Sequence, residues 1–192
     1  MRSRRWLLSS VALAGLLLTS FGCPFITKPG DHSDQESPFK PRTSPENLLI
    51  NLRAAYLERD AVQFDSLLAK DFTFEVSEWS VQEENLEPSW GREEEMRIHH
   101  HMFEGTSIQQ LTLEFDIGPR KEPDEGEEGD VVIEIHNVTM YLHAFIEGEE
   151  IQKRVNGDMS RFLFRKNGWT DPATGDSIWT IVRWKDIHVT GK

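Results

Sequence analysis

The stretch that decides the fold is residues 131–166, which read VVIEIHNVTMYLHAFIEGEEIQKRVNGDMSRFLFRK. Its first part, Val131 to Ile146, is rich in the β-branched and aromatic residues that strands favour. Glu147-Gly148-Glu149 predicts a turn, and Ile151 to Lys166 predicts a strand that returns antiparallel to the first. We therefore expect a long hairpin in the second half of the chain.

Further strands are predicted on both sides of this hairpin. Apolar and polar residues alternate from Asp71 to Val76 and again from Leu111 to Ile117, as they do in strands with one buried face. Downstream, Asn167-Gly168 predicts a turn, and Ile178 to Val189 predicts the last strand. The acidic stretch Glu122 to Asp130 contains two glycines and a proline, so it predicts a solvated hairpin loop. A calcium site is the alternative for this loop, but the EF-hand spacing is missing.

Helices are predicted ahead of most of the strands. Thr43-Ser44-Pro45-Glu46 predicts a helix start, because a hydroxyl N-cap precedes a proline and an acid in the first turn. Apolar residues then recur at spacings of three and four from Leu48 to Tyr56 and, in a second short helix, from Val62 to Leu68. A third helix is expected from Arg92 to Phe103. This order predicts an α+β fold, with about three N-terminal helices packed on a curved antiparallel sheet.

The N-terminus predicts an export signal. Three arginines within the first five positions precede an apolar stretch of 13 residues, Trp6 to Leu18, which is too short to span a bilayer. The single cysteine of the protein, Cys23, follows Gly22 at the expected cleavage point. This arrangement resembles a bacterial lipoprotein signal and implies lipid attachment at Cys23, although Ser20 replaces the usual leucine. An ordinary cleaved signal is the alternative.

The segment after Cys23 predicts a tether. Four of the nine prolines fall between Pro24 and Arg42, and no apolar periodicity is present there. We expect a signal peptide over residues 1–22, a flexible tether over 23–42 and a folded domain over 43–192. Because Pro24 is not the aspartate that retains many lipoproteins at the inner membrane, we expect an envelope protein sorted to the outer membrane where the host has one.

Composition excludes two classes of function. Acidic residues outnumber basic ones 33 to 21, giving a formal charge of −12, so we expect no nucleic-acid partner. The single cysteine excludes an internal disulfide and a multi-thiolate zinc site.

Three stretches of the predicted domain carry a resemblance to a known family. The first is LRAAYLERD, from Leu52 to Asp60, which continues through Phe64 to Phe74; the second is Trp90-Gly91-Arg92-Glu93-Glu94. The third is the pair Arg161-Phe-Leu-Phe164 and Trp179-Thr-Ile-Val-Arg-Trp184. Over about residues 43 to 189 the chain resembles the NTF2-like superfamily, the SnoaL and ketosteroid-isomerase fold. The resemblance implies a cone, in which a curved sheet wraps around the helices and leaves a pocket at the open end.

The resemblance also allows a check for steroid-isomerase chemistry. That reaction needs a phenol, a carboxylate base and a protonated acid. Matching the shared segments puts these roles at Leu52, Val76 and Ser160. None of the three residues fills its role, so we expect no catalytic residues of that type.

Five residues are candidates for lining the pocket. Asp158 and Ser160 share strand parity with Phe162 and Phe164, whose bulk belongs inside. His100 shares a helical stripe with Met96 and Phe103. Aromatic side chains complete the set, which is Trp90, His100, Asp158, Ser160 and Trp184.

The three consecutive histidines, His99 to His101, do not predict a metal site. Successive helical residues point about 100° apart, so the three rings cannot converge on one ion. We expect no metal and no cofactor.

The expected function is non-catalytic binding by a membrane-tethered envelope lipoprotein. The ligand would be a small apolar molecule or another envelope protein. The alternative is an envelope isomerase, cyclase or hydratase that uses Asp158 and His100. A third expectation is an assembly role, with a homodimer formed through the sheet.

Overall fold

The computed structural model describes residues 37–188 except 84, 147–148 and 157–158. Cys23 and Asp158 therefore lie outside the described residues. The elements are α1 (Pro45–Glu58), α2 (Ala61–Leu67), β1 (Leu68–Glu75), α3 (Glu78–Glu83), β2 (Ser89–Gly91), α4 (Arg92–Glu104), β3 (Ile108–Lys121), β4 (Val131–Ile146), β5 (Glu149–Asn156), β6 (Met159–Thr170) and β7 (Ser177–Ile187).

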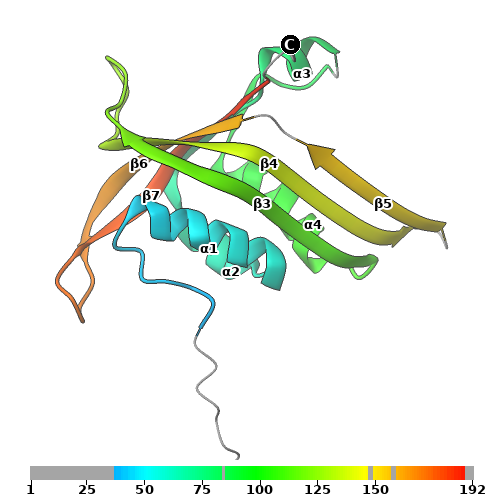
Figure 1. The fold of residues 1–192 in the computed structure, drawn as a ribbon, viewed down its shortest axis with the longest axis horizontal. Helices are drawn as coiled ribbons and strands as arrows, with labels where there is room; N and C mark the ends of the chain where they lie inside the picture. The colour runs from blue at the N-terminus through cyan, green and yellow to red at the C-terminus, as the bar shows by residue number, and fades with distance from the viewer. Residues whose placement is uncertain (1–36, 84, 147–148, 157–158, 189–192) are drawn as a thin grey trace, which may run out of the picture. The chain divides into compact units, whose positions relative to one another are not determined.

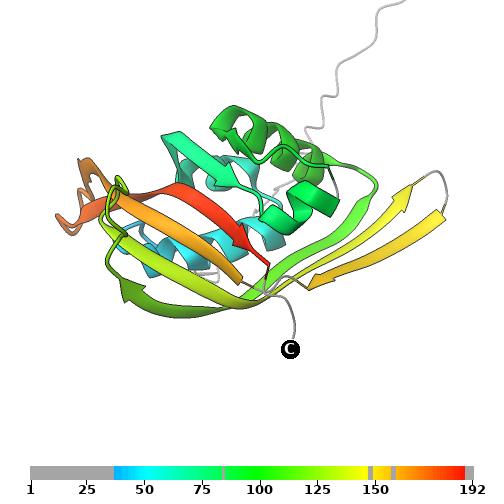
Figure 2. The same ribbon diagram turned by 90° about the horizontal axis from the view of Figure 1, so that it is seen from above.

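The predicted α+β fold is confirmed. Helices α1, α2 and α4 cover one face of a curved, unclosed sheet (Figures 1 and 2). The strand order is β2-β1-β7-β6-β4-β3, and β5 pairs with the far part of β4. Among the described helices, none is long and apolar enough to cross a membrane.

The sheet differs from the prediction in being mixed. Strand β1 runs parallel to β7, while the other neighbouring strands are antiparallel. The difference arises because the first and last strands of the chain lie side by side, and alternation within a strand does not reveal its partner.

Three local predictions are also corrected. The return strand expected over residues 151–166 is two strands, β5 and β6, which pair with different parts of β4. A fourth helix, α3, begins beyond Ser77, whose hydroxyl accepts a hydrogen bond from Ser80 N at 3.2 Å. Gly168 lies inside β6 at a bulge, with φ +83°, instead of forming the turn between strands. The turn comes later, where Asp171 N donates to Asp176 O.

Caps fix the first helices as the sequence indicates. Ser44 accepts from Asn47 N at the start of α1, and Asp60 accepts from Gln63 N at the start of α2. Between them, Arg59 has φ 54° and ends α1 in the left-handed conformation. Its guanidinium donates to the carbonyls of α4 and the start of β3, so one side chain joins three elements.

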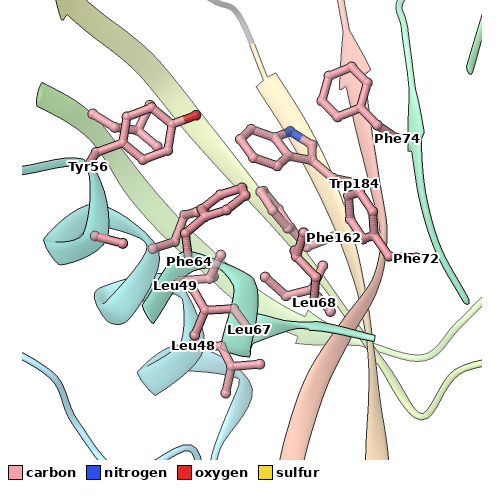
Figure 3. Close-up of a cluster of buried hydrophobic side chains, with 14 of the residues drawn as sticks. Leu48, Leu49, Tyr56, Phe64, Leu67, Leu68, Phe72, Phe74, Phe162 and Trp184 are labelled. Atoms are coloured by element: carbon pink, nitrogen blue, oxygen red, sulfur yellow. The ribbon is translucent and has the colours of Figure 1, made fainter. Parts of the chain in front are cut away.

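The core fills the space between the helices and the concave face of the sheet. Leu48 and Leu49 of α1 and Leu67 of α2 lie opposite Phe162 of β6 (Figure 3). A much smaller apolar cluster lies apart from this core and consists of Ala69, Val132, Leu163 and Val182. Because Phe162 and Leu163 are neighbours on β6, the two clusters occupy opposite faces of the sheet.

The folded part begins before the predicted boundary at residue 43. Phe39 packs against the core, and Lys40 exchanges two hydrogen bonds with the buried side chain of Asn51. Arg42 accepts a backbone hydrogen bond from Trp179 at 2.9 Å. Residues 39–42, expected in the tether, are therefore part of the domain.

Candidate functional site

A cavity of about 470 Å³ lies within the folded part, on the same side of the sheet as the core. Every described strand, and every described helix except α2, contributes residues to its wall. Most of that wall is apolar, and five aromatic side chains stand out: Tyr56, Phe74, Trp79, Trp90 and Trp184. This volume falls in the range of small-molecule sites in proteins.

A tyrosine and a histidine form the first polar group of the cavity. The Tyr56 hydroxyl lies 2.7 Å from His99 Nε2, and His99 Nδ1 lies 2.9 Å from the backbone carbonyl oxygen of Glu95. A carbonyl can only accept, so Nδ1 carries the proton and Nε2 accepts from Tyr56. Burial lowers the pKa of His99 to about 4, which keeps the ring neutral at pH 7.

Packing holds this histidine in place. The ring stacks on Phe64 with centroids 3.8 Å apart and meets Phe103 edge-on. Since the Tyr56 proton is engaged by His99, the phenol presents acceptor lone pairs to the cavity. An unshared phenol donor, which oxyanion stabilisation needs, is therefore not provided.

Glu95 is the most unusual group of the cavity. Its side chain lies on α4, and the residue is only 2% exposed. Its carboxylate oxygen Oε2 accepts from Trp90 Nε1 at 2.6 Å, and Oε1 lies 3.5 Å from His99 Nδ1. Burial is the main cause that raises the pKa of Glu95 to about 7; the negative charge of Asp186 acts in the same direction, and the hydrogen bond from Trp90 opposes it. Near neutral pH this group exists in both protonation states.

Asp186 is the second carboxyl group of the cavity. Both of its hydrogen bonds end on Oδ1, which accepts from Ser160 Oγ at 2.7 Å and from Trp184 Nε1 at 3.1 Å. No donor among the described residues bonds Oδ2. Burial raises the pKa of Asp186, while the two hydrogen bonds oppose that shift.

The structure brings together three of the five predicted pocket residues. Trp90, Ser160 and Trp184 all line the cavity. Asp158 lies outside the described residues. His100 is a correction: its side chain is 49% exposed and bonds Glu104 at 2.9 Å, away from the cavity. The spacings 96-99-103 and 96-100-103 both fit a helix, and the sequence stripe selected the wrong one.

The sequence patterns do not assign four polar residues to the site: Tyr56, Glu95, His99 and Asp186. Glu95 belongs to the run Glu93-Glu94-Glu95, which is typical of a solvated first turn. Its spacing of four from His99 was the available signal, since it places both side chains on one helix face. Tyr56 lies on the predicted apolar face of its helix. It follows by one turn Leu52, which occupies the predicted phenol position and is fully buried in the core. Asp186 lies two residues after Trp184 in the last strand, and no local pattern marks it as a site residue.

The two other positions tested for isomerase chemistry have structural roles. Val76 packs against the core, and Ser160 is a buried hydroxyl that donates to Asp186. Within the described part of the chain, no group of three His, Cys, Asp or Glu side chains could hold a metal ion.

No family model and no curated protein matches the sequence. A conserved protein from Planctomyces limnophilus is similar in structure, with a TM-score of 0.51 and 11% identity over 75% of this chain and 92% of that chain. An NTF2-like protein of unknown function in nutrient uptake from Rhodospirillum rubrum has a TM-score of 0.45 and 17% identity, over 77% and 99% of the two chains. An NTF2-like protein with a cystatin-like fold from Novosphingobium aromaticivorans has a TM-score of 0.41 and 15% identity, over 76% and 79%. The likeness to the Planctomyces limnophilus protein shows a shared fold and nothing more.

Proposed function

We propose that the folded part of the chain binds a small, mainly apolar molecule in the cavity without transforming it. The observation that carries the proposal is an apolar cavity of about 470 Å³ lined by two carboxyl groups, the buried one of Glu95 and the half-buried one of Asp186. Apolar walls supply affinity, and a few fixed polar groups orient the ligand. The neutral His99–Tyr56 pair supports binding over catalysis because its proton is held within the pair.

Native mass spectrometry of the domain, purified from its own host, tests this proposal. We expect a retained small molecule that is lost in Met140→Trp, because Met140 lines the cavity and a larger ring there fills it. The control is Leu57→Trp, the same new side chain at an exposed position of α1. Equal retention by both variants would show that the ligand binds elsewhere.

Proton transfer is the second candidate function. It rests on one observation, the pKa of about 7 at Glu95, which suits a general acid or base near neutral pH. The exposed side chain of His100 disfavours the version that pairs it with Asp158. If ligand incubated with the protein is converted, Glu95→Gln should abolish conversion even at ligand concentrations that saturate the variant. Unchanged turnover in that variant would eliminate Glu95 as the acting group.

The location is a separate proposal, supported by the sequence of residues 1–23. We propose that Cys23 is acylated and tethers the domain to the cell envelope, facing the periplasm or the exterior. Labelled palmitate should enter the wild-type protein, and Cys23→Ser should move the protein from the membrane fraction to the soluble fraction. Unlabelled wild-type protein would contradict the lipid anchor.

A further inference from the structure

The cavity has an unbalanced charge. Glu95 and Asp186 both line it, and none of the described lining residues is a lysine or an arginine. Two histidines also line the cavity: His99 is held neutral by burial and its tautomer, and His188 stacks on Trp79 with ring centroids 4.8 Å apart. A buried carboxylate without a cationic partner is costly, and the two carboxyl groups raise the cost for each other.

Each carboxyl group is held by a tryptophan. Trp90 donates its indole N–H to Glu95, and Trp184 donates its own to Asp186. Trp90 also stacks on Phe74 with centroids 4.6 Å apart, and Trp184 meets the same phenylalanine edge-on at 5.4 Å. The arrangement therefore repeats one unit twice, an aromatic ring fixed next to a carboxyl group. Figure 3 shows Phe74 and Trp184 near each other within the buried cluster.

Both parts of this unit attract the same kind of ligand. Aromatic faces attract cations through their quadrupole, most strongly where water is excluded. Among tryptophan, tyrosine and phenylalanine, tryptophan attracts cations most strongly. Carboxylates attract cations by their charge, and they would repel a carboxylate or phosphate ligand. An uncharged ligand would leave the carboxyl groups of Glu95 and Asp186 without a counter-charge.

We propose that the cavity ligand is an organic cation, an amine or quaternary ammonium group carried on an apolar body. This inference rests on the proposed function, since it names the class of molecule that the cavity binds. The cationic group lies between the carboxyl groups of Glu95 and Asp186, against the rings of Trp90 and Trp184. The apolar body lies against the methionine and aliphatic side chains of the same wall, among them Met102, Leu113, Val138 and Met140.

Matched probes separate this inference from the proposed function. The first series consists of benzyltrimethylammonium and longer arylalkyl trimethylammonium ions. The second series consists of their neutral carbon isosteres, beginning with neopentylbenzene, which have the same shape without the charge. Binding is followed by quenching of tryptophan fluorescence, because Trp79, Trp90 and Trp184 line the cavity. We expect each cation to bind at least about tenfold more tightly than its isostere.

Variants locate the charge. Glu95→Gln and Asp186→Asn keep an acceptor for the neighbouring indole and remove the negative charge. Each should weaken cation binding about tenfold and leave the isostere unchanged. Glu127→Gln is the matched control, because it removes a carboxylate that does not line the cavity. The affinity of this variant for the cations should equal that of the wild type.

Three outcomes overturn the inference, and they differ in whether the proposed function also fails. Equal binding of cation and isostere leaves the proposed function standing and shows that charge is irrelevant. A preference for cations that survives both cavity variants shows that the cation binds elsewhere. If neither series binds, the inference fails and the proposed function fails with it.

Discussion

Glu95 and Glu127 are both glutamates, and they lie on opposite sides of one sheet. Their pKa values are shifted in opposite directions. The pKa of Glu95 rises to about 7, whereas hydrogen bonds from Arg161 lower the pKa of Glu127 to about 2. Glu95 is held by a neutral indole, and Glu127 by two guanidinium groups, those of Arg161 and Arg183. Among the described residues, the concave side therefore holds carboxyl groups without a lysine or arginine partner, and the outer side pairs Glu127 with two arginines.

The difference teaches where the chain keeps uncompensated charge. On the outer side, the loop between β3 and β4 is fixed by ion pairs, so Glu127 has a structural explanation. On the concave side, no structural partner balances Glu95 or Asp186 among the described residues. A charged group that lowers the stability of the folded state, and that no ion pair compensates, is a candidate for a functional role.

The largest expected effect concerns the core that separates the two sides. Phe162 of β6 is fully buried against the helices, and Phe162→Ala should reduce the free energy of unfolding by about 3–5 kcal/mol. Arg165→Ala changes the outer side of the same strand and should cost less than about 1 kcal/mol. Urea denaturation of both variants measures the contrast. Similar losses would mean that the outer ion pairs matter as much as the core.

The second prediction concerns Glu95 itself. Its folded-state pKa lies above the unfolded value of 4.5, so the protonated form favours folding and stability falls as pH rises from 4.5 toward 7. Glu95→Gln cannot ionise, and at pH 8 it should stabilise the domain by about 3 kcal/mol, with no gain at pH 4. Denaturation at the two pH values measures the difference. Glu94→Gln, at the neighbouring and more exposed position, is the control.

His99 sharpens this test because its slope has the opposite sign. Its folded-state pKa of about 4 lies below the unfolded value of 6.5, so its contribution to stability is lost as pH falls through that interval. In the wild type the slopes of Glu95 and His99 oppose each other between pH 4.5 and 6.5. In Glu95→Gln only the His99 slope remains, so the stability of the variant relative to wild type should increase as pH rises from 4.5 to 6.5. A constant difference would contradict the raised pKa of Glu95, and a variant whose own stability does not fall between pH 6.5 and pH 4 would contradict the lowered pKa of His99.

The third prediction concerns Glu127, whose side chain is 11% exposed. A lowered pKa contributes stability that is present above pH 4.5 and lost as pH falls toward 2. Glu127→Gln should therefore cost about 1–2 kcal/mol at pH 7 and almost nothing near pH 2. The sign is opposite to that of Glu95→Gln. A stabilising Glu127→Gln at pH 7 would remove the contrast between the two sides.

The sequence predicts the elements better than it predicts the site. Helix caps at Ser44 and Asp60 are local signals, and the alternation of Phe162 and Phe164 correctly assigns the inner face. The parallel pairing of β1 with β7 depends on contacts between distant residues, which no local pattern contains. The charge state of Glu95 depends on burial, and a run of three glutamates gives no sign of which one is buried. The same holds for the neighbouring histidines: both fit the helical spacing, but His99 is buried and His100 is exposed.

The smallest expected effect tests whether burial, and not pairing alone, sets the energies compared above. Asp71 resembles Glu127 in having a pKa lowered by hydrogen bonds from an arginine, here Arg165. Its side chain, however, is 59% exposed, so water and salt screen the pair. Asp71→Asn should cost at most about 0.5 kcal/mol at low ionic strength and nothing measurable in 1 M NaCl. Urea denaturation at both salt concentrations, beside Glu127→Gln, makes the comparison. If Asp71→Asn costs as much as Glu127→Gln and resists salt, pairing alone explains the outer side, and exposure does not distinguish its carboxylates.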